Sequence, residues 1–445
     1  MHYKTISESI KRQYERKFVS AAEAVSVIQS GDVVYIHPGC AVPEVLVDAM
    51  VARAEELQNV EVCHLLGVGE AAYVRPEMQG HFRHNAFFIG KNVRRAVCEG
   101  RADFTPIFLH EVTSLLYSHA YRVDVALIHV SPPDEHGYCS LGVSVECTKA
   151  ATEVAKVVIA QINPNMPRTL GDSFIHMNKI DYCVEADVPI KGLPQQEGNE
   201  TAEETAIYQR IGANVAGLIE DGATLQLGIG RIPDAVVQYL GDRKHLGIHS
   251  EMVSDGVLPL IESGVISNRK KTLLPGKIVV AFVLGSQKLF DFVDNNPAFE
   301  FRPTHFTNDP FTIARNKKMV AINSALEIDL TGQVCADSIG YKFYSGFGGQ
   351  LDFIRGAAKS EGGKPIIALP STAKDGTVSR ITPSLKEGAG VTTSRGDVHY
   401  VATEYGIVNL HGKTIRERIE MLIGIAHPNF RAELERVAQE KFFTC

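Results

Sequence analysis

Short runs of β-branched and other apolar residues alternate with helical patterns along the whole chain. The runs that predict strands begin at positions 33 (VVYIH), 60 (VEVCHLL), 123 (VDVALIHV), 224 (TLQLGI), 277 (KIVVAFVL) and 365 (PIIALP). Parallel strands need crossover connections, which a helix usually supplies, so this alternation is typical of α/β proteins with parallel sheets. The pattern therefore predicts an α/β fold.

Two segments present the same order of helix, glycine turn, strand and glycine. Residues 20–39 align with residues 210–230 at an offset of 191 positions, which places Gly31 on Gly222 and Gly39 on Gly230. A proline then opens a predicted helix in each copy, Pro43 before EVLVDAM and Pro233 before DAVVQYL, as the first helical turn tolerates. We interpret the chain as two related α/β halves. The alternative is coincidence, because this order opens any doubly wound unit.

Length and loop composition indicate how these halves are divided. At 445 residues the chain exceeds the size at which one hydrophobic core stops growing, so two or three domains are expected. Polar, glycine and proline residues gather at 190–202 (IKGLPQQEGNETA), which is typical of a linker. We therefore assign residues 1–192 to an N-terminal domain and residues 193–445 to a C-terminal domain.

Composition excludes several classes of partner. The net charge is -7 and no dense cluster of Lys and Arg appears, which disfavours nucleic acid. The first residues lack the apolar core of a secretory signal, and no apolar run reaches the ~18 residues of a membrane helix. The eight cysteines contain no C-x-x-C pair, which favours reduced, mostly buried thiols. We expect a cytoplasmic protein that binds neither nucleic acid nor membrane.

The first candidate motif is LQLGIGRIPDAV. Gly228, Ile229 and Gly230 follow the predicted strand, and Pro233 starts the predicted helix. Glycines let a ligand approach the backbone, and a helix N-terminus presents N–H groups to an anion or an oxyanion. The alternative is a tight turn with no ligand.

A dinucleotide-binding site is a competing interpretation of the same motif. Glu251 follows the G-x-G pair by about twenty residues, where a ribose-binding acid would lie. However, Pro233 occupies the position of the third glycine, which that fingerprint needs for close packing of helix and strand. The proline argues against nicotinamide binding.

The second candidate motif is HLGIHSEMVSDGVLPLIESGV. HLGIH predicts a short strand, Glu251 lies at its exit, and residues 257–261 predict a helix. Open α/β sheets bind ligands at the carboxyl ends of their strands, so Glu251 is placed for chemistry. Asp255 is an alternative, although its position before Gly256 suits a turn.

The third candidate motif is FYSGFGGQLDFIRGAA, in which Gly346, Gly348 and Gly349 lead into a predicted helix that contains Asp352 and Arg355. These glycines would allow a second segment or a ligand to come into contact. The nearby PSTAKDGTVSRI adds Lys374 and Arg380, which could meet the phosphates of a nucleotide-bearing substrate or lie exposed.

Metal and triad chemistry find little support. His81 and His84 in HFRH and the run DEHGYC at 134 are not joined by further ligands at a suitable spacing. No G-x-S-x-G nucleophile elbow occurs. We expect no bound metal.

The motifs GIGRIP, HSEMVSDG, FGGQLDF and TEYGIVNLHG, together with residues 87–111 and 131–151, carry a resemblance over nearly the whole chain. The chain resembles the acetyl-CoA hydrolase/transferase family, and within it the butyrate and 4-hydroxybutyrate CoA-transferases. The resemblance implies two related open α/β domains of the CoA-transferase type, with the active site between them. It also implies a nucleophilic glutamate in S-E-M-x-S-D-G, which matches Glu251.

Further site residues rest on the same resemblance. It implies that the loop Gly228–Gly230, with Gly348 and Gly349, supplies backbone donors near the thioester carbonyl and contacts CoA. Asn323 in INSALEIDL resembles an asparagine that lies beside the glutamyl thioester. We include three more residues among those that contact CoA or the oxyanion: Gln226, Leu227 and Lys374.

The activity that the resemblance implies is transfer of CoA from an acyl-CoA to a short-chain carboxylic acid by a ping-pong mechanism. Acetate is the expected partner of butyrate or 4-hydroxybutyrate, while propionate and succinate stay open as second acids. An acyl-CoA hydrolase that uses the same glutamate is the alternative. No cofactor beyond the substrate CoA is expected, and a homodimer is the default for an oligomer.

Overall fold

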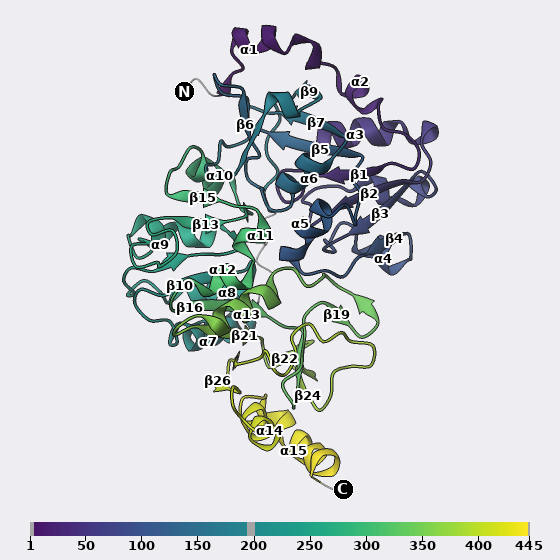
Figure 1. Ribbon diagram of the computed structural model, residues 1–445. Coiled ribbons are helices and arrows are strands. Elements are labelled where there is room, and N and C mark those ends of the chain that lie inside the picture. The colour runs from purple at the N-terminus through teal and green to yellow at the C-terminus, as the bar shows by residue number, and fades with distance from the viewer. Residues whose placement is uncertain (1–3, 194–200, 444–445) are drawn as a thin grey trace. The chain divides into compact units, whose positions relative to one another are not determined.

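The computed structural model describes residues 4–193 and 201–443 (Figure 1). Contacts divide the chain into two compact units. The first comprises residues 1–194 and 279–307, and the second comprises residues 195–278 and 308–445.

The segment 279–307 is where this division differs from the predicted ranges 1–192 and 193–445. Phe282 forms an antiparallel bridge with Ser144, and Phe301 forms a parallel bridge with Gly171, which joins the segment to the first unit. Such pairing between distant residues has no local signal in the sequence. That residues 1–192 and 193–445 fold as separate domains stays a prediction. Most of the predicted linker, residues 194–200, lies outside the described residues.

The first unit is built on a seven-stranded sheet in which every strand is parallel to its neighbours. Its order is β4 (Ala102–Phe104), β3 (Phe82–Ala86), β2 (Val60–His64), β1 (Val33–Ile36), β5 (Val125–Val130), β7 (Val157–Ile162) and β9 (Tyr182–Glu185). β5 is buried along its whole length and β7 nearly so, as expected for strands covered on both faces.

Helices and short strands complete this unit. The helices are α1 (Glu8–Gln13), α2 (Ala21–Val25), α3 (Glu44–Ala52), α4 (Arg94–Cys98), α5 (Leu109–Tyr117), α6 (Thr148–Val154), α10 (Gln287–Val293) and α11 (Thr304–Thr307). The short strands are β6 (Tyr138–Ser140), β8 (Phe174–His176), β13 (Ile278–Val280), β14 (Phe282–Val283) and β15 (Phe299–Phe301). α3 packs Leu46, Val47 and Met50 into the core beside the strands β1 and β2.

The second unit also has a sheet whose central strands are parallel. It runs β12 (Met252–Val253), β10 (Thr224–Leu227), β16 (Met319–Ser324), β21 (Lys364–Ala368), β25 (Tyr400–Thr403) and β26 (Gly406–Asn409), with β11 (Gly247–Ile248) also paired to β10. β12 and β26 are antiparallel to β10 and β25. The predicted α/β class with two parallel-sheet parts is therefore confirmed.

The helices of the second unit are α7 (Ala202–Ala216), α8 (Arg231–Gln238), α9 (Leu258–Glu262), α12 (Pro310–Ala314), α13 (Gln350–Lys359), α14 (Ile415–Gly424) and α15 (Pro428–Phe442). Its short strands are β17 (Glu327–Asp329), β18 (Val334–Cys335), β19 (Ser338–Ile339), β20 (Lys342–Phe343), β22 (Thr372–Ala373), β23 (Val378–Ser379) and β24 (Ile381–Thr382). α12 and α13 pack together, and Ile313, Phe353 and Ala357 share a core cluster with β16 residues.

The two aligned sequence segments adopt matching local structures. β1 and β10 begin and end at the same offset of 191 positions, and both members of each glycine pair have positive φ: Gly31 +80° and Gly222 +74°, Gly39 +64° and Gly230 +109°. The helix starts differ from the prediction by a few residues. Pro43 is the N-cap of α3, whereas α8 begins at Arg231 and contains Pro233 as its third residue. The proline still lies in the first turn, where its missing N–H has no cost.

Two compositional predictions can be compared with the described chain. Cys98 is exposed, whereas Cys40, Cys63, Cys139, Cys147, Cys183 and Cys335 are buried, as expected for most of the thiols. None of the helices in residues 4–193 and 201–443 has the length and apolar content needed to cross a bilayer.

Candidate active site

Glu251 lies in a bend at the carboxyl end of β10. β11 runs parallel to β10, and β12 returns antiparallel to it with Met252 paired to Leu227, so the chain reverses direction between them. Ser250 is buried in this bend, and its Oγ lies 2.7 Å from the carbonyl oxygen of Met252 and 3.1 Å from that of Leu227. The serine of the S-E-M motif therefore fixes the backbone that carries Glu251.

A buried lysine anchors the strand that precedes this bend. Lys271 Nζ donates to the carbonyl oxygens of Ile248 and Lys277, both at 2.7 Å, and Asn268 Oδ1 accepts from the Ile248 N–H at 2.9 Å. A Cβ on Gly247 would overlap the Lys271 side chain, so β11 needs a glycine at this position. These bonds hold β11 in place from the side that β10 does not cover.

The Glu251 carboxylate is held by two donors from distant parts of the second unit. Asn308 Nδ2 donates to Oε2 at 2.9 Å, and the backbone N–H of Gly349 donates to the same carboxylate. A Cβ on Gly349 would lie within 3.0 Å of both Glu251 Oε2 and Asn308 Nδ2. Gly349 has a φ of -98°, so close approach rather than backbone conformation requires glycine here.

The surroundings of this carboxylate raise its pKa. Burial has the largest effect, the Asn308 and Gly349 hydrogen bonds oppose it, the charge of Asp352 adds to it, and the result is a pKa of about 7. Asp352 is 2% exposed and lies in the first turn of α13, for which Gly349 is the N-cap. The residue Glu251 as a whole is only partly buried, while its carboxylate is densely surrounded. A carboxyl group with this pKa is about half ionised at neutral pH.

Gln226 and Asn323 form an amide pair on neighbouring strands near this bend. Asn323 Nδ2 donates to Gln226 Oε1 at 3.0 Å, and Leu227 pairs with Ile322 on one side and Met252 on the other. The structure thus brings Asn323 to Gln226, at the same end of the sheet as Glu251. The amide that bonds to Glu251 belongs to Asn308.

The glycine loop 228–230 follows the end of β10 at which Glu251 also lies. Gly228 directly follows Leu227, and Glu251 directly precedes Met252, the residue with which Leu227 pairs. Gly230 is the N-cap of α8 and has a φ of +109°, a backbone conformation that favours glycine. A Cβ placed there would have no atom within 4 Å, so the backbone conformation and not lack of space requires glycine at this position. Ile229 between them is 43% exposed. The loop therefore combines a backbone that needs glycine with open space beside it.

The remaining residues of the third motif separate into two groups. Gly348, with a φ of +54°, turns the chain so that Gly349 can start α13 beside Glu251. Lys374 lies in the exposed turn between β22 and β23 with a φ of +49°, and the described contacts do not join it to Glu251. Arg380 is partly buried and donates to the carbonyl oxygens of Thr372 at 3.1 Å and Leu326 at 3.3 Å. Arg380 therefore binds the protein's own backbone.

Asp255 occupies a turn, as the sequence suggests, because it begins the 3-10 helix η7 (Asp255–Val257). It faces Asp234 of α8, whose pKa is raised by burial first and by the charge of Asp255 second. The Glu251 carboxylate has its own partners, Asn308 and Gly349, and does not share this acidic pair.

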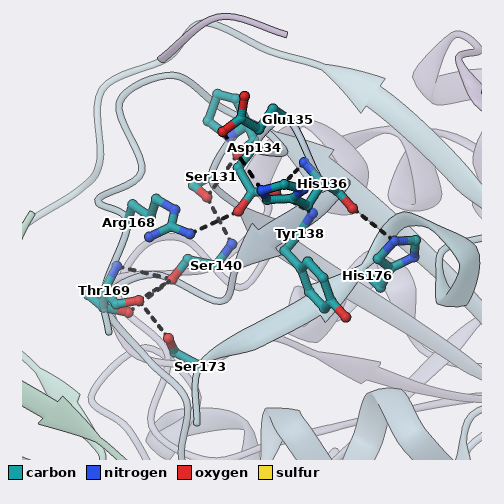
Figure 2. A network of polar contacts seen from close by, with 11 residues as sticks. Ser131, Asp134, Glu135, His136, Tyr138, Ser140, Arg168, Thr169, Ser173 and His176 are labelled. Carbon is teal, nitrogen blue, oxygen red and sulfur yellow. Dashed lines mark hydrogen bonds and ion pairs between the residues drawn. The ribbon is translucent and has the colours of Figure 1, made fainter. Parts of the chain in front are cut away.

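The metal candidates are engaged in hydrogen bonds within the first unit. Figure 2 shows the DEHGYC turn, where Asp134 accepts from the N–H groups of His136 and Tyr138 at 3.0 Å and pairs with Arg168 at 2.9 Å. His84 is buried against His64 with 4.3 Å between ring centroids. Across the described part of the chain, no group of three His, Cys, Asp or Glu side chains is arranged to hold a metal ion.

Asn308 is the residue at this site that the sequence reasoning did not identify. It lies in HFTNDP, directly before Asp309, whose carboxylate caps α12 by accepting from the N–H of Thr312 at 2.9 Å. The N-D-P sequence signals a helix start, and only the packing of α12 against α13 shows that the asparagine reaches Glu251.

Comparisons with known proteins give one consistent result. The chain matches the model of the acetyl-CoA hydrolase/transferase N-terminal domain over residues 3–191 and that of the C-terminal domain over residues 285–438. It is 54% identical over 430 residues to the 4-hydroxybutyrate coenzyme A transferase of Clostridium kluyveri, which covers 96% of this chain and 99% of that protein.

Two further proteins extend this likeness. The chain is 47% identical over 423 residues to the succinyl-CoA:acetate/propanoyl-CoA:succinate CoA transferase of Fasciola hepatica, covering 94% of this chain and 87% of that protein. The crystal structure of a 4-hydroxybutyrate CoA-transferase from Porphyromonas gingivalis is similar with a TM-score of 0.83 and 42% identity, covering 97% of this chain and 100% of that one.

Proposed function

This chain belongs to the acetyl-CoA hydrolase/transferase family and is a CoA-transferase of short-chain acids, and we propose that Glu251 is its covalent nucleophile. The family and the enzyme class predicted from the sequence are confirmed. The observation that carries the proposal for Glu251 is its carboxylate, held by Asn308 and Gly349 at the carboxyl end of β10 with a raised pKa.

The first half of the reaction forms a thioester on the enzyme. A Glu251 carboxylate oxygen attacks the acyl-CoA carbonyl, the C–S bond breaks, and a mixed anhydride and CoA thiolate result. The thiolate then attacks Glu251 Cδ and expels the first carboxylate product, which carries away the attacking oxygen. The enzyme is left with CoA bound to Glu251 as a thioester.

The second half reverses these steps with another acid. The incoming carboxylate attacks Cδ of the glutamyl thioester and releases CoA thiolate, and the thiolate then attacks the acyl carbonyl of the new anhydride. Glu251 leaves as a carboxylate with one oxygen from the incoming acid. Every bond formed replaces one of the same kind, so the equilibrium constant of each half is close to unity and the kinetics are ping-pong.

The chemistry needs donors for the oxyanions and exclusion of water. We infer that the Gly228–Gly230 loop and Gly348 and Gly349 contribute backbone donors at the thioester carbonyl, with Gln226, Leu227 and Asn323 beside them. Lys374 is an exposed cation that is proposed to contact CoA phosphate. No group beyond the substrate CoA is required by these steps, because neither a redox change nor an energy-rich phosphate takes part.

We propose acetyl-CoA and 4-hydroxybutyrate as the physiological pair, with butyrate as the second choice. Two of the similar proteins, from different organisms, carry the 4-hydroxybutyrate CoA-transferase name. The Fasciola hepatica protein is named for succinate, acetate and propanoyl-CoA, so propionate and succinate belong in any substrate panel. We also propose a homodimer, the commonest closed oligomer, which sedimentation of the purified protein tests.

Mass spectrometry of the Glu251 peptide tests this function. Acetyl-CoA alone should load CoA onto Glu251 in the native enzyme, and Glu251→Gln should carry no adduct. The loaded enzyme is then offered acetate, propionate, butyrate, 4-hydroxybutyrate and succinate, and the fastest new acyl-CoA identifies the acid. Steady release of thiol without any acceptor acid would instead show the alternative function, an acyl-CoA hydrolase.

A further inference from the structure

We infer that Asn308 is a catalytic residue, which stabilises the glutamyl oxygen Oε2 whenever a nucleophile attacks Glu251 Cδ. This inference rests on the proposed role of Glu251 and adds to it the group that serves the enzyme's own carbonyl. Its basis is the 2.9 Å hydrogen bond from Asn308 Nδ2 to Oε2 and the close packing of Gly349 over both atoms.

The oxygen Oε2 of Glu251 is held in place by its neighbours. Oε2 accepts from Asn308 and is covered by the Gly349 backbone, where even a methyl group would not fit. An oxygen held in this way cannot advance toward an acyl carbonyl without losing a charge-assisted hydrogen bond. Oε1 is therefore the oxygen that attacks, and Oε2 is the one that stays.

The fate of Oε2 follows from the atoms exchanged in each half-reaction. When CoA thiolate attacks Cδ of the anhydride, the C=O bond to Oε2 opens and Oε2 takes up the negative charge. The C–Oε1 bond then breaks, the carboxylate product leaves with Oε1, and the charge on Oε2 returns to the carbonyl. Attack of the second acid on the thioester places charge on Oε2 again. Oε2 is thus the oxyanion of every tetrahedral intermediate centred on Cδ.

Asn308 is rigidly placed for this task. It is fully buried, and the following Asp309 caps α12 through bonds to the N–H and hydroxyl of Thr312 at 2.9 and 2.8 Å. α12 in turn packs closely on α13, since a Cβ on Gly356 would overlap Ile313. The donors from Asn308 and Gly349 are therefore fixed by the same pair of helices. Preorganised donors of this kind need no rearrangement when charge develops.

Removing an oxyanion donor lowers kcat by about 10²–10³-fold in enzymes where this has been measured. We expect Asn308→Ala to lower kcat by about this factor and to leave KM for acyl-CoA nearly unchanged, because the amide contacts the glutamate rather than the substrate. Asn308→Asp keeps the shape but replaces the donor by an acceptor, and should be at least as slow. Asn316→Ala is the matched control, since Asn316 is also fully buried and its Nδ2 donates to the backbone carbonyl of Ile313 at 3.3 Å.

A measurement confined to Cδ separates this role from a structural one. Each enzyme is loaded with CoA on Glu251, freed of substrate, and mixed with hydroxylamine, which attacks the glutamyl thioester at Cδ. The rate of CoA release should fall about 100-fold or more in Asn308→Ala and Asn308→Asp, and stay at the native value in Asn316→Ala. Thermal melting of all four proteins confirms that they are folded before the rates are compared.

The possible outcomes distinguish failure of the role of Asn308 from failure of the proposed nucleophile Glu251. Native rates of hydroxylamine attack in a folded Asn308 variant would overturn the role of Asn308, while the CoA adduct on Glu251 would still stand. If native enzyme and acetyl-CoA gave no adduct on Glu251, the proposed nucleophile itself would be wrong. If Asn308→Ala does not fold, the shape-conserving Asn308→Asp decides the question by the same assay.

Discussion

Replacing Glu251 by glutamine should make the protein more stable at alkaline pH although it removes the nucleophile. Burial and the Asp352 charge raise the pKa of Glu251 from 4.5 to about 7 in the folded protein. Above pH 7 the group is ionised in both states, and the folded state then bears the whole penalty of holding a charge it disfavours. Glutamine keeps the shape and the oxygen that accepts from Asn308, without the charge.

The size of the effect follows from the pKa. A difference of about 2.5 pKa units corresponds to about 3 kcal/mol, and partial exposure of Glu251 reduces this to about 2 kcal/mol. The folded carboxyl binds its proton more tightly than the unfolded one, so the penalty grows as pH rises from about 4.5 to 7. At pH 5 it should be below about 1 kcal/mol.

Thermal melting at pH 8 and pH 5 measures this difference. For a unit of this size, about 2 kcal/mol raises the melting temperature by roughly 4–8 °C, so Glu251→Gln should gain that amount at pH 8 and little at pH 5. Glu420→Gln is the control, because Glu420 is an exposed carboxylate of the same unit. A shift of equal size at both pH values, or a loss of stability at pH 8, would refute the reasoning.

Three further predictions concern the site and the first unit. The kcat/KM of the native enzyme should rise with pH through an apparent pKa near 7. Asp352→Asn should move this rise in the pH profile to lower pH, because it removes the charge that opposes ionisation of Glu251. A rise at the same pH in both enzymes would show that the two carboxylates do not interact. Gly349→Ala should lower kcat by at least about 100-fold, since its Cβ would displace the carboxylate of Glu251, while the melting temperature of the first unit should change little. Near-native turnover would show that Gly349 does not pack against this carboxylate. Burial lowers the pKa of His37 and His64 to about 4, so the stability that their neutral rings contribute above pH 6.5 should be lost as pH falls toward 4. Limited proteolysis of the first unit at pH 7 and pH 4.5 measures this loss. Equal resistance to the protease at both pH values would count against neutral buried imidazoles.

Most of the strand runs that the sequence predicts are strands in the structure, because their signal is local, while β3, β4, β7, β9, β16 and β25 were not among the predicted runs. β1, β2, β10 and β21 begin within a residue of the predicted runs, since short runs rich in apolar and β-branched residues favour a buried strand. The run at 277 is an exception. It breaks into β13 and β14, and contacts of residues 279–307 with the first unit depend on partners more than a hundred residues away.

The position of Glu251 illustrates how far local pattern can reach. A short apolar run followed by Ser250 and Glu251 predicts a strand exit, and the structure has a bend there between β11 and β12. The family likeness then supplies a role that spacing alone leaves open between a dinucleotide site and a nucleophile. Lys374 shows the limit of the same approach, because the local sequence of an exposed turn does not indicate which ligand, if any, the turn binds.

By itself the sequence determined the α/β class, the two matching strand-to-helix openings, and the acid at the exit of β11. Each of these follows from residues that are neighbours along the chain, where periodicity and glycine or proline chemistry act directly. Only the tertiary structure decided that Asn308, 57 positions away from Glu251, donates to its carboxylate, and that Gly349 packs over both. That meeting depends on how α12 and α13 pack against one another, and helix packing is set by side chains of both helices together rather than by either segment alone.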